Sequence, residues 1–357
     1  MTEDSLLEII RQELPISHPS LIVGSGDDCA VVRPPPEGHS LVLKTDATLE
    51  GIHFTQETDL SAVGWKALCR PISDFAAMGA IPQHALVTVA APLVRMFHAD
   101  LLRKPESRMD AALDSHFDLG SMYAYSPASI CSPVLPHQTS RLPRHNQHEI
   151  SGLAWSENEW RDLSRGMGKA ARTFNITIIG GEITRSPTTL FISVTLSGIT
   201  GPRTLLRSAA QPNDVICVTG KLGGSFQSGR HLTFLPRLLE GQWLAAQSGV
   251  HAMMDLSDGL GSDLPRLARA SQCNFFIEEN NIPCHEDSST QEAITHGEDY
   301  ELLVTIDPKA WLKLHADWKN NFSTLELTPI GTMTSLKTPT TPIPPGFDHV
   351  EGSKRTL

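Results

Sequence analysis

The chain lacks the features that mark several classes of protein. None of its apolar stretches approaches the roughly 20 residues needed to cross a bilayer, so no membrane-spanning segment is expected. Basic residues are also few, because 29 Lys and Arg stand against 40 Asp and Glu and leave a formal charge of -11. Nucleic acids and anionic membranes favour basic surfaces, so neither is expected as a general partner.

The six cysteines are widely scattered and form neither a C-x-x-C pair nor a group with zinc-ligand spacing. We interpret them as reduced thiols of a cytoplasmic protein, since the N-terminus carries no secretory-signal pattern and free cysteine behaves as a small hydrophobe. The G-x-x-x-x-G-K-[ST] loop and the H-R-D and D-F-G motifs of protein kinases are absent as well. Any ATP chemistry must therefore use another phosphate-binding arrangement.

The length and apolar content are sufficient for about two domains with separate cores, since the chain has 357 residues of which 40% are hydrophobic. The first part is rich in strands, whereas strands alternate with helices in the second part. We therefore expect a two-domain fold of the α+β or α/β class. Its N-terminal α+β domain would cover residues 1–199, and its C-terminal α/β domain residues 200–357.

Apolar periodicity and turn residues locate the expected elements. Asp59 is expected to cap a helix that Pro71 kinks or ends, and a strand over 175–179 is expected to end in a turn at Gly180 and Gly181. The expected helices cover 6–14, 61–70, 157–174, 235–247, 262–270 and 308–318, and the expected strands cover 41–44, 84–91, 175–179, 190–197, 215–219, 252–256, 274–277 and 301–306.

Residues 95–154 differ in composition from the rest of the chain. This stretch contains several prolines and five histidines, and no helical or strand period persists through it. A histidine metal site is one hypothesis, but the histidines lack ligand-like spacing, so we favour a solvated insertion to which no chemistry is assigned.

Carboxylates recur beside glycines or at the ends of expected strands. Each could be an ordinary helix cap or turn residue, but five such places in one chain favour a shared pocket. Clustered carboxylates repel one another unless a cation neutralises them, and oxygen ligands together with substrate phosphates suit Mg²⁺. We therefore predict a magnesium-dependent phosphate site. The residues concerned are Asp27, Asp28, Asp46, Asp74, Asp255, Asp258, Glu298 and Asp299.

A glycine-rich segment over residues 219–229 follows one of the expected strands. Its backbone amides could line an anion, or the segment could simply be a flexible loop, and the sequence favours neither.

Seven segments are similar to those of the thiamine-monophosphate kinase family and occur in the same order. They read GSGDDCAVV, LKTDATLEGIHF, GWKALCRPISDFAAMGAIP, IIGGEITRSP, LLRSAAQPNDVICVTG, MMDLSDGLGSDL and HGEDYELLVT. The resemblance extends to the superfamily of aminoimidazole ribonucleotide synthetase. It implies a homodimer joined through its N-terminal sheets, with ATP and several Mg²⁺ ions between the two domains. The implied reaction transfers the γ-phosphoryl group of ATP directly to thiamine monophosphate, without a catalytic side chain.

The resemblance also implies roles for individual residues. The implied magnesium ligands are Asp28, Lys44 through its carbonyl, Thr45, Asp46, Asp74, Glu182, Asp255 and Asp258. The implied ATP contacts are Gly181, Arg207 and Ser257, and the implied thiamine monophosphate contacts are His53, Glu298 and Phe347.

Two departures from the family pattern leave alternatives open. Glu182 with Ile183 stands where the family has aspartate and threonine, and the insertion at 95–154 stands where the family has a short link. Lys44 also stands where the family often has serine. Because Mg²⁺ tolerates little error in its short bonds, a glutamate at this place could shift or weaken the metal site. The alternatives are a non-catalytic or impaired nucleotide-binding dimer, and a sister ATP-dependent enzyme of the same superfamily.

Overall fold

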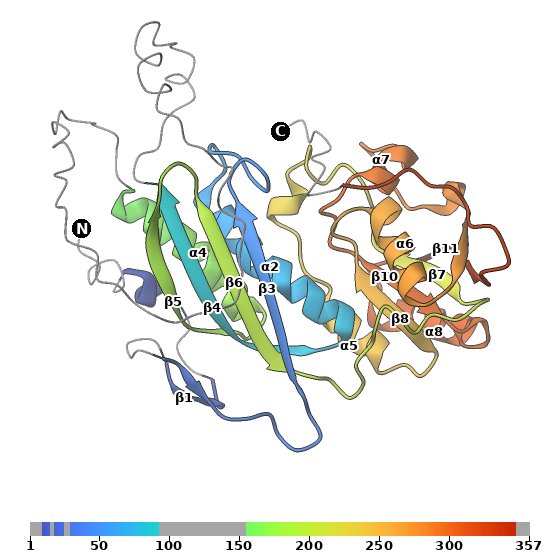
Figure 1. The fold of residues 1–357 in the computed structure, drawn as a ribbon, viewed down its shortest axis with the longest axis horizontal. Coiled ribbons are helices and arrows are strands. Elements are labelled where there is room, and N and C mark those ends of the chain that lie inside the picture. The colour runs from blue at the N-terminus through green and yellow to red at the C-terminus, as the bar shows by residue number, and fades with distance from the viewer. Residues whose placement is uncertain (1–8, 15–17, 25–28, 93–154, 348–357) are drawn as a thin grey trace, which may run out of the picture.

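The computed structural model describes residues 9–14, 18–24, 29–92 and 155–347, whose two larger sheets lie in separate halves of the molecule (Figure 1). The predictions for Asp27 and Asp28 and for the insertion at 95–154 lie outside the described residues. No helix within the described residues is both long and apolar enough to cross a membrane.

The N-terminal half is built on a four-stranded sheet with the order β3-β6-β4-β5. Strands β4 and β5 are parallel, and the other neighbours are antiparallel. A separate antiparallel pair lies beside it, formed by β1 (Leu21–Val23) and β2 (Val31–Val32). The four strands are β3 (Leu41–Leu49), β4 (Ile81–Pro92), β5 (Thr177–Ser186) and β6 (Phe191–Ile199).

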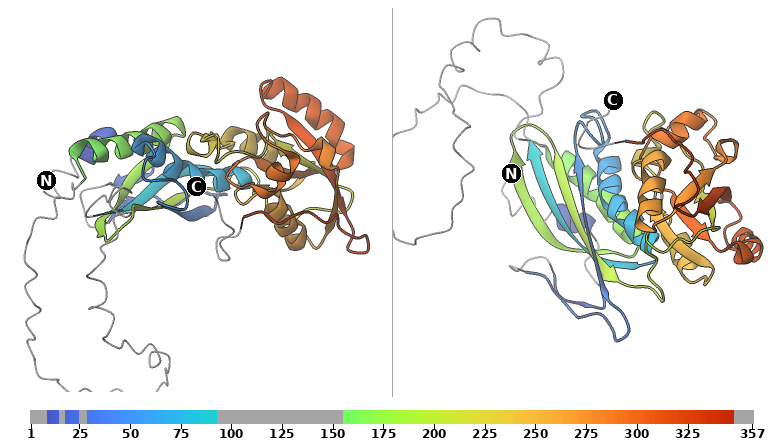
Figure 2. Two further views of the ribbon diagram at one scale, coloured as in Figure 1. Left: turned by 90° about the horizontal axis from the view of Figure 1, so that it is seen from above. Right: turned by 45° about the vertical axis from the view of Figure 1, so that its right-hand side comes forward.

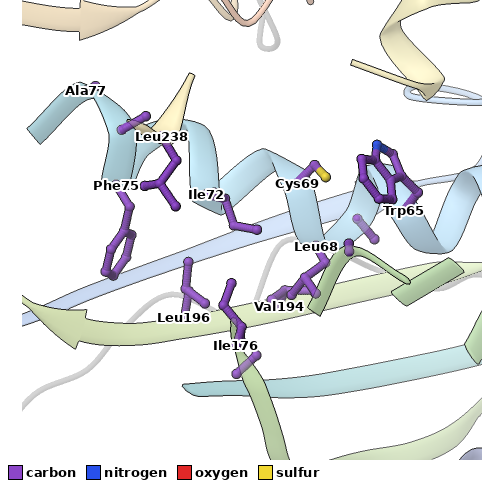
Figure 3. Close-up of a cluster of buried hydrophobic side chains, with 14 of the residues drawn as sticks. Trp65, Leu68, Cys69, Ile72, Phe75, Ala77, Ile176, Val194, Leu196 and Leu238 are labelled. Atoms are coloured by element: carbon purple, nitrogen blue, oxygen red, sulfur yellow. The ribbon is translucent and has the colours of Figure 1, made fainter. Parts of the chain in front are cut away.

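One face of this sheet is covered by α2 (Leu60–Met78) and α4 (Glu157–Thr173), which also pack against each other (Figure 2). The core between helix and sheet is apolar. Figure 3 shows Leu68, Ile72 and Phe75 of α2 directed toward buried side chains of β6. Burial of this apolar face stabilises α2 far more than its intrinsic helix propensity does.

The cap of α2 matches the sequence prediction, and α4 has a capping box that was not predicted. Asp59 Oδ1 accepts a hydrogen bond from the Ala62 N–H (2.9 Å), and Ser156 forms a reciprocal capping box with Glu159. Pro71 was predicted to kink or to end this helix, and the second of these alternatives is wrong, because α2 continues through this buried proline to Met78. A proline removes one backbone hydrogen bond, and packing of α2 on both the sheet and α4 outweighs that loss.

The predicted turn at Gly180 and Gly181 is also wrong, since β5 runs through both glycines to Ser186. The register between β4 and β5 shifts between Ala85 and Leu86, as expected for a β-bulge, which glycine accommodates. Gly181 has a packing reason of its own. A Cβ atom at this position would lie 1.8 Å from the carbonyl oxygen of Val87 on the neighbouring strand.

The C-terminal half contains a five-stranded sheet with the order β8-β10-β7-β11-β9, in which all described neighbours are antiparallel. The expected two-domain fold of mixed helices and strands is therefore confirmed. The prediction of an α/β class for the C-terminal half is wrong, because its alternating strands and helices build an antiparallel sheet, which makes this half α+β. The strands are β7 (Val215–Thr219), β8 (Val250–Asp255), β9 (Asn274–Ile277), β10 (Leu302–Ile306) and β11 (Leu327–Thr334).

The helices of this half are α5 (Leu238–Ala245), α6 (Leu260–Ala270), α7 (Thr290–Thr295) and α8 (Pro308–Asn321), with 3-10 turns η2 (Arg230–Leu232) and η3 (Glu279–Asn281). Helix α2 contacts β8, α5 and η2 in addition to its own sheet. It therefore lies between the two halves of the molecule and is shared by both (Figure 1).

We expect Gly181→Ala to destabilise the protein by about 1 to 3 kcal/mol, because overpacking against the Val87 carbonyl forces the two strands apart. The measurement is the denaturant dependence of unfolding. Gly180→Ala is the matched control, since its added Cβ would meet only Leu86 Cδ2 at 3.4 Å. Equal stability of the two variants would contradict a packing role for Gly181.

Candidate active site

Helix α2 carries a stripe of charged residues on the side that faces the C-terminal half. Lys66, Arg70 and Asp74 are spaced four residues apart, which places them on one face of the helix. Each of these three side chains contacts a residue from another element. Lys66 and Arg70 are not among the predicted site residues, although charged residues at this spacing in an otherwise apolar helix are a readable signal.

A cluster of aspartates surrounds one lysine at the end of this stripe. Lys44 and Asp46 lie on the same face of β3, and the Lys44 ammonium is 2.9 Å from Asp74 Oδ2 and 3.5 Å from Asp46 Oδ1. Asp255, the last residue of β8, accepts a hydrogen bond from the Ser73 hydroxyl (2.8 Å). The aspartates thus come from β3, α2 and β8, in both halves of the chain.

The pKa values report how crowded this negative charge is. Burial raises the pKa of Asp74 to about 8, with Asp255 and Asp46 adding to the shift and Lys44 opposing it. Burial likewise raises the pKa of Asp255 to about 6, against the hydrogen bond from Ser73. The pKa of Lys44 is raised, because its attraction to Asp74 and Asp46 outweighs burial, which alone would lower it. The single ammonium of Lys44 is therefore too little positive charge to neutralise the carboxylates of Asp46, Asp74 and Asp255.

The donor set suits Mg²⁺, since every group is an oxygen-bearing carboxylate or hydroxyl. Within the described residues, no group of three or more His, Cys, Asp or Glu is arranged to hold a metal ion. Mg²⁺ does not require such a cage, because it is usually held by one or two carboxylates together with substrate phosphates and water. Asp46 and Asp74 fit this requirement.

The structure does not bring two of the predicted ligands to this cluster. Thr45 alternates with its neighbours on β3, so its hydroxyl lies on the outer face of the sheet, where it accepts a hydrogen bond from Thr195 (3.2 Å). Glu182 lies on the same outer face, in register with Thr88 and, through β6, with Ala47. Three strand spacings separate β5 from β3, a distance of about 14 Å.

Two predicted ATP contacts also lie away from the aspartates. Gly181 shares a row with Asp46 but sits on the opposite edge strand. Arg207 is exposed, and its carbonyl accepts a hydrogen bond from Ser271 (2.9 Å) just beyond the C-terminus of α6. Asp258 precedes the N-terminus of α6, whereas the Arg207 contact lies beyond its C-terminus. The length of this helix, about 16 Å, therefore separates Arg207 from Asp258.

The third ATP contact, Ser257, and the predicted ligand Asp258 form a tight turn after β8. The buried carboxylate of Asp263 accepts hydrogen bonds from the backbone N–H groups of both (3.1 and 2.9 Å). Arg266 bridges the side chains of Asp258 and Asp263. The N–H of Phe347 donates to the Asp258 carbonyl (2.8 Å), so this predicted substrate residue lies beside the turn.

A second group joins the two halves through Lys66. Its ammonium is fully buried, donates to the His53 carbonyl (2.6 Å) and forms an ion pair with Glu298. The His53 ring nitrogen Nδ1 accepts from the Leu49 N–H (3.0 Å). Two predicted substrate residues, His53 and Glu298, are thus brought together, and their contact with substrate stays a prediction.

Arg70 connects the Lys66 group with the aspartate cluster. Its guanidinium donates to the Ala47 carbonyl on β3. Burial alone would lower its pKa, but Tyr300, Asp46 and Glu298 raise the pKa above its ordinary value. Tyr300 in turn stacks on Phe234, with ring centroids 3.9 Å apart. Arg70 is therefore a fixed cation at the boundary of the two halves.

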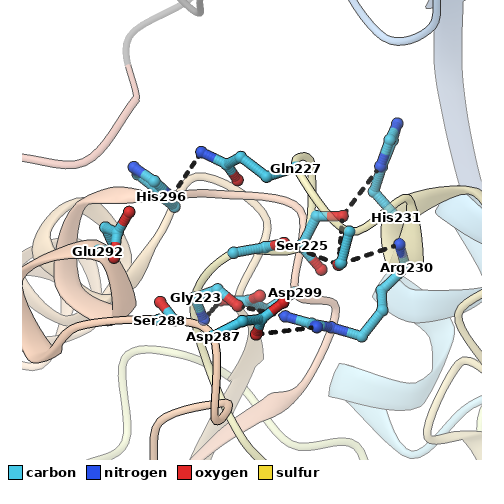
Figure 4. A network of polar contacts seen from close by, with 12 residues as sticks. Gly223, Ser225, Gln227, Arg230, His231, Asp287, Ser288, Glu292, His296 and Asp299 are labelled. Atoms are coloured by element: carbon cyan, nitrogen blue, oxygen red, sulfur yellow. Dashed lines mark hydrogen bonds and ion pairs between the residues drawn. The ribbon is translucent and has the colours of Figure 1, made fainter.

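The glycine-rich segment after β7 is ordered by polar contacts rather than left open (Figure 4). The Gly223 N–H donates to Asp299 (2.9 Å), and Arg230 donates to the Gly223 carbonyl (2.5 Å). Burial raises the pKa of Asp299 to about 7, against the hydrogen bond from Gly223. This segment is thereby fixed to the loop that carries Glu298.

Comparisons with known proteins give the family of the chain. The N-terminal domain of AIR synthase related proteins matches residues 26–117 and 146–200, and the corresponding C-terminal domain matches residues 204–336. The thiamine-monophosphate kinase of Rhodopirellula baltica is 30% identical over 318 residues, covering 84% of this chain and 81% of the relative. The chain belongs to the thiamine-monophosphate kinase family.

Further relatives and solved structures match the chain over most of its length. The thiamine-monophosphate kinase of Bacillus subtilis is 27% identical over 83% of this chain and 81% of its own. The crystal structure of that enzyme from Stenotrophomonas maltophilia has a TM-score of 0.68 at 26% identity, with 94% of this chain and 95% of the other covered. AaThiL complexed with AMPPCP and TMP shares the fold, with a TM-score of 0.59 at 21% identity over 93% and 91% of the two chains.

We expect Lys66→Met to lower the free energy of unfolding by about 3 to 5 kcal/mol, because it leaves the Glu298 carboxylate buried without its partner. Urea unfolding of the ligand-free protein measures the loss. The double variant Lys66→Met with Glu298→Gln is expected to recover part of it.

The control for this loss is Lys313→Met, which removes an exposed ion pair with Asp317 on α8. Exposed pairs contribute little, so this variant is expected to keep nearly full stability. If Lys66→Met were no more harmful than the control, the buried pair would not hold the halves together.

Proposed function

We propose that the protein is an ATP-dependent, Mg²⁺-dependent kinase that phosphorylates thiamine monophosphate to thiamine diphosphate. One observation carries the proposal: aspartates from β3, α2 and β8 converge where the two halves of a member of this family meet. ATP and thiamine monophosphate are both anionic, so a site that joins them must supply positive charge.

The reaction needs charge neutralisation and alignment more than it needs a reactive side chain. A phosphate oxygen of thiamine monophosphate attacks the γ-phosphorus, a new O–P bond forms, and the bond to the β-phosphate oxygen breaks to release ADP. Bound Mg²⁺ supplies neutralisation of the phosphate oxygens and holds them in line.

Different residues of the site are proposed to bind the metal, ATP and thiamine monophosphate. Asp46 and Asp74 would hold Mg²⁺, with Asp255 close enough to share it. Asp263 fixes the turn at Ser257 and Asp258, so that its polar groups face ATP in a constant geometry. His53, Glu298 and Phe347 are proposed to line the thiamine monophosphate site beside these residues.

The test is an assay of purified protein with ATP, Mg²⁺ and thiamine monophosphate. Thiamine diphosphate and ADP should form in equal amounts, and Asp74→Asn should lower the rate by about 100-fold or more because a carboxylate that holds the metal is lost. Asp317→Asn, an exposed carboxylate on α8, is the matched control and should keep the wild-type rate.

Two alternatives give different outcomes in this assay. A non-catalytic nucleotide-binding dimer, suggested by Glu182 and Ile183, would bind ATP without forming product. A sister ATP-dependent enzyme of the superfamily would release ADP only with another acceptor. Absence of thiamine diphosphate at saturating substrates would overturn the proposed function.

We also propose that the protein is a cytoplasmic homodimer joined through the outer face of the N-terminal sheet. The cysteines at positions 29, 69, 217, 273 and 284 are free thiols, as suits a reducing compartment. Leu41, Leu43 and Leu86 lie on that face with 55%, 64% and 43% of their surface exposed, which supports an interface there.

Replacement of Leu43 and Leu86 by Asp is expected to convert the dimer into monomers, because it places charge in an apolar interface. Sedimentation equilibrium measures the mass. Leu312→Asp is the control, since this leucine on α8 is 80% exposed but lies in the other half of the molecule. A dimer that survives the double change would place the interface elsewhere.

A further inference from the structure

Lys44 is the member of the aspartate cluster that magnesium coordination does not explain. An ammonium group has three donors and no acceptor, so its side chain cannot bind a metal ion and repels one nearby. Yet the side chain reaches between Asp46 and Asp74, the two carboxylates best placed to hold Mg²⁺. The Lys44 side chain and the metal therefore compete for the same oxygen atoms.

The other cations near the cluster, Lys66 and Arg70, have partners outside it. Lys66 is fully buried and forms its ion pair with Glu298, and Arg70 donates to the Ala47 carbonyl. Among the described ion pairs, those of Asp46 and Asp74 are made by Lys44.

The Lys44 side chain also remains within reach of a ligand. It lies on β3, an edge strand of the sheet, and 33% of its surface is exposed, whereas Lys66 has none. A phosphate group brought to Asp46 and Asp74 by a metal ion would meet this ammonium at the same place. A compact ammonium contacts phosphate as a point charge.

We propose that the Lys44 ammonium is a fixed cation of the active site that replaces one divalent ion. It neutralises Asp46 and Asp74, contacts a phosphate of ATP, and makes the protein take up one Mg²⁺ fewer per nucleotide than a variant without this charge. The inference rests on the proposed function only in taking ATP as the nucleotide. It replaces the predicted carbonyl contact of Lys44 by a role for its side chain.

The experiment counts bound divalent ions rather than product. Mn²⁺ binding to the full chain with AMPPCP is followed by the electron paramagnetic resonance signal of free Mn²⁺, for the wild type and for Lys44→Ser, Lys44→Ala and Lys44→Arg. Lys44→Ser and Lys44→Ala should each bind one more Mn²⁺ per chain than the wild type. Lys44→Arg keeps the charge and should bind the wild-type number.

Nucleotide affinity gives a second readout. The slope of the logarithm of AMPPCP affinity against the logarithm of Mg²⁺ concentration counts the ions taken up, so it should rise by about one when the charge is removed. Equal counts and equal slopes for the wild type, Lys44→Ser and Lys44→Ala would overturn the inference. A gain in Lys44→Arg equal to that in Lys44→Ser would also overturn it, because the charge would then not be the cause.

Turnover of thiamine monophosphate by the wild type is measured in parallel. If the wild type turns over thiamine monophosphate but binds as many ions as Lys44→Ser, the proposed function stands and the role of Lys44 is overturned. Absence of turnover with one extra ion in Lys44→Ser removes the proposed function and keeps Lys44 as the fixed cation of a nucleotide site. Thermal unfolding of each variant verifies that the fold is kept.

Discussion

The arrangement of this protein depends on charged groups of α2 that are placed between two apolar cores. Lys66 is fully buried and Arg70 and Asp74 are partly buried, so a charge left unpaired in such a place would be destabilising. Each is therefore paired with a group from another element: Glu298 for Lys66, the Ala47 carbonyl for Arg70, and Lys44 for Asp74. These pairs set the positions of β3 and of the loop after α7 relative to the helix.

The aspartate cluster has the opposite balance, since it gathers more negative charge than its own lysine neutralises. That excess is unfavourable for folding and useful for binding divalent ions, which is a common compromise at functional sites. The family pattern and the geometry agree on this point, because Asp46, Asp74 and Asp255 lie far apart in sequence and adjacent in space. Lys44 changes how the charge of this cluster is balanced, whereas Glu182 lies at the opposite edge of the sheet.

Much of the architecture could be predicted from local patterns. The strands β7 and β9 have the predicted bounds, and α4 begins at the predicted residue because its capping box is readable in sequence. The errors arose where tertiary packing overrode a local rule. Pro71 does not end α2, and the two glycines at 180 and 181 lie within β5, because neighbouring elements hold both segments in place.

The site was less predictable than the fold, because a motif gives residue types and not the face on which they lie. Alternation along β3 separates the Thr45 hydroxyl from Asp46, and strand order places Glu182 at the opposite edge of the sheet. Lys66 and Arg70 were missed because their partners, Glu298 and Ala47, are remote in sequence.

The hydrogen bond from Ser73 to Asp255 crosses from one half of the molecule to the other at the aspartate cluster itself. A rotation of the C-terminal sheet about α2 would stretch this bond and move Asp255 away from Asp74. If the cluster holds divalent ions as proposed, the same rotation would also weaken their binding. Bound metal and nucleotide would then stiffen the contact between the halves.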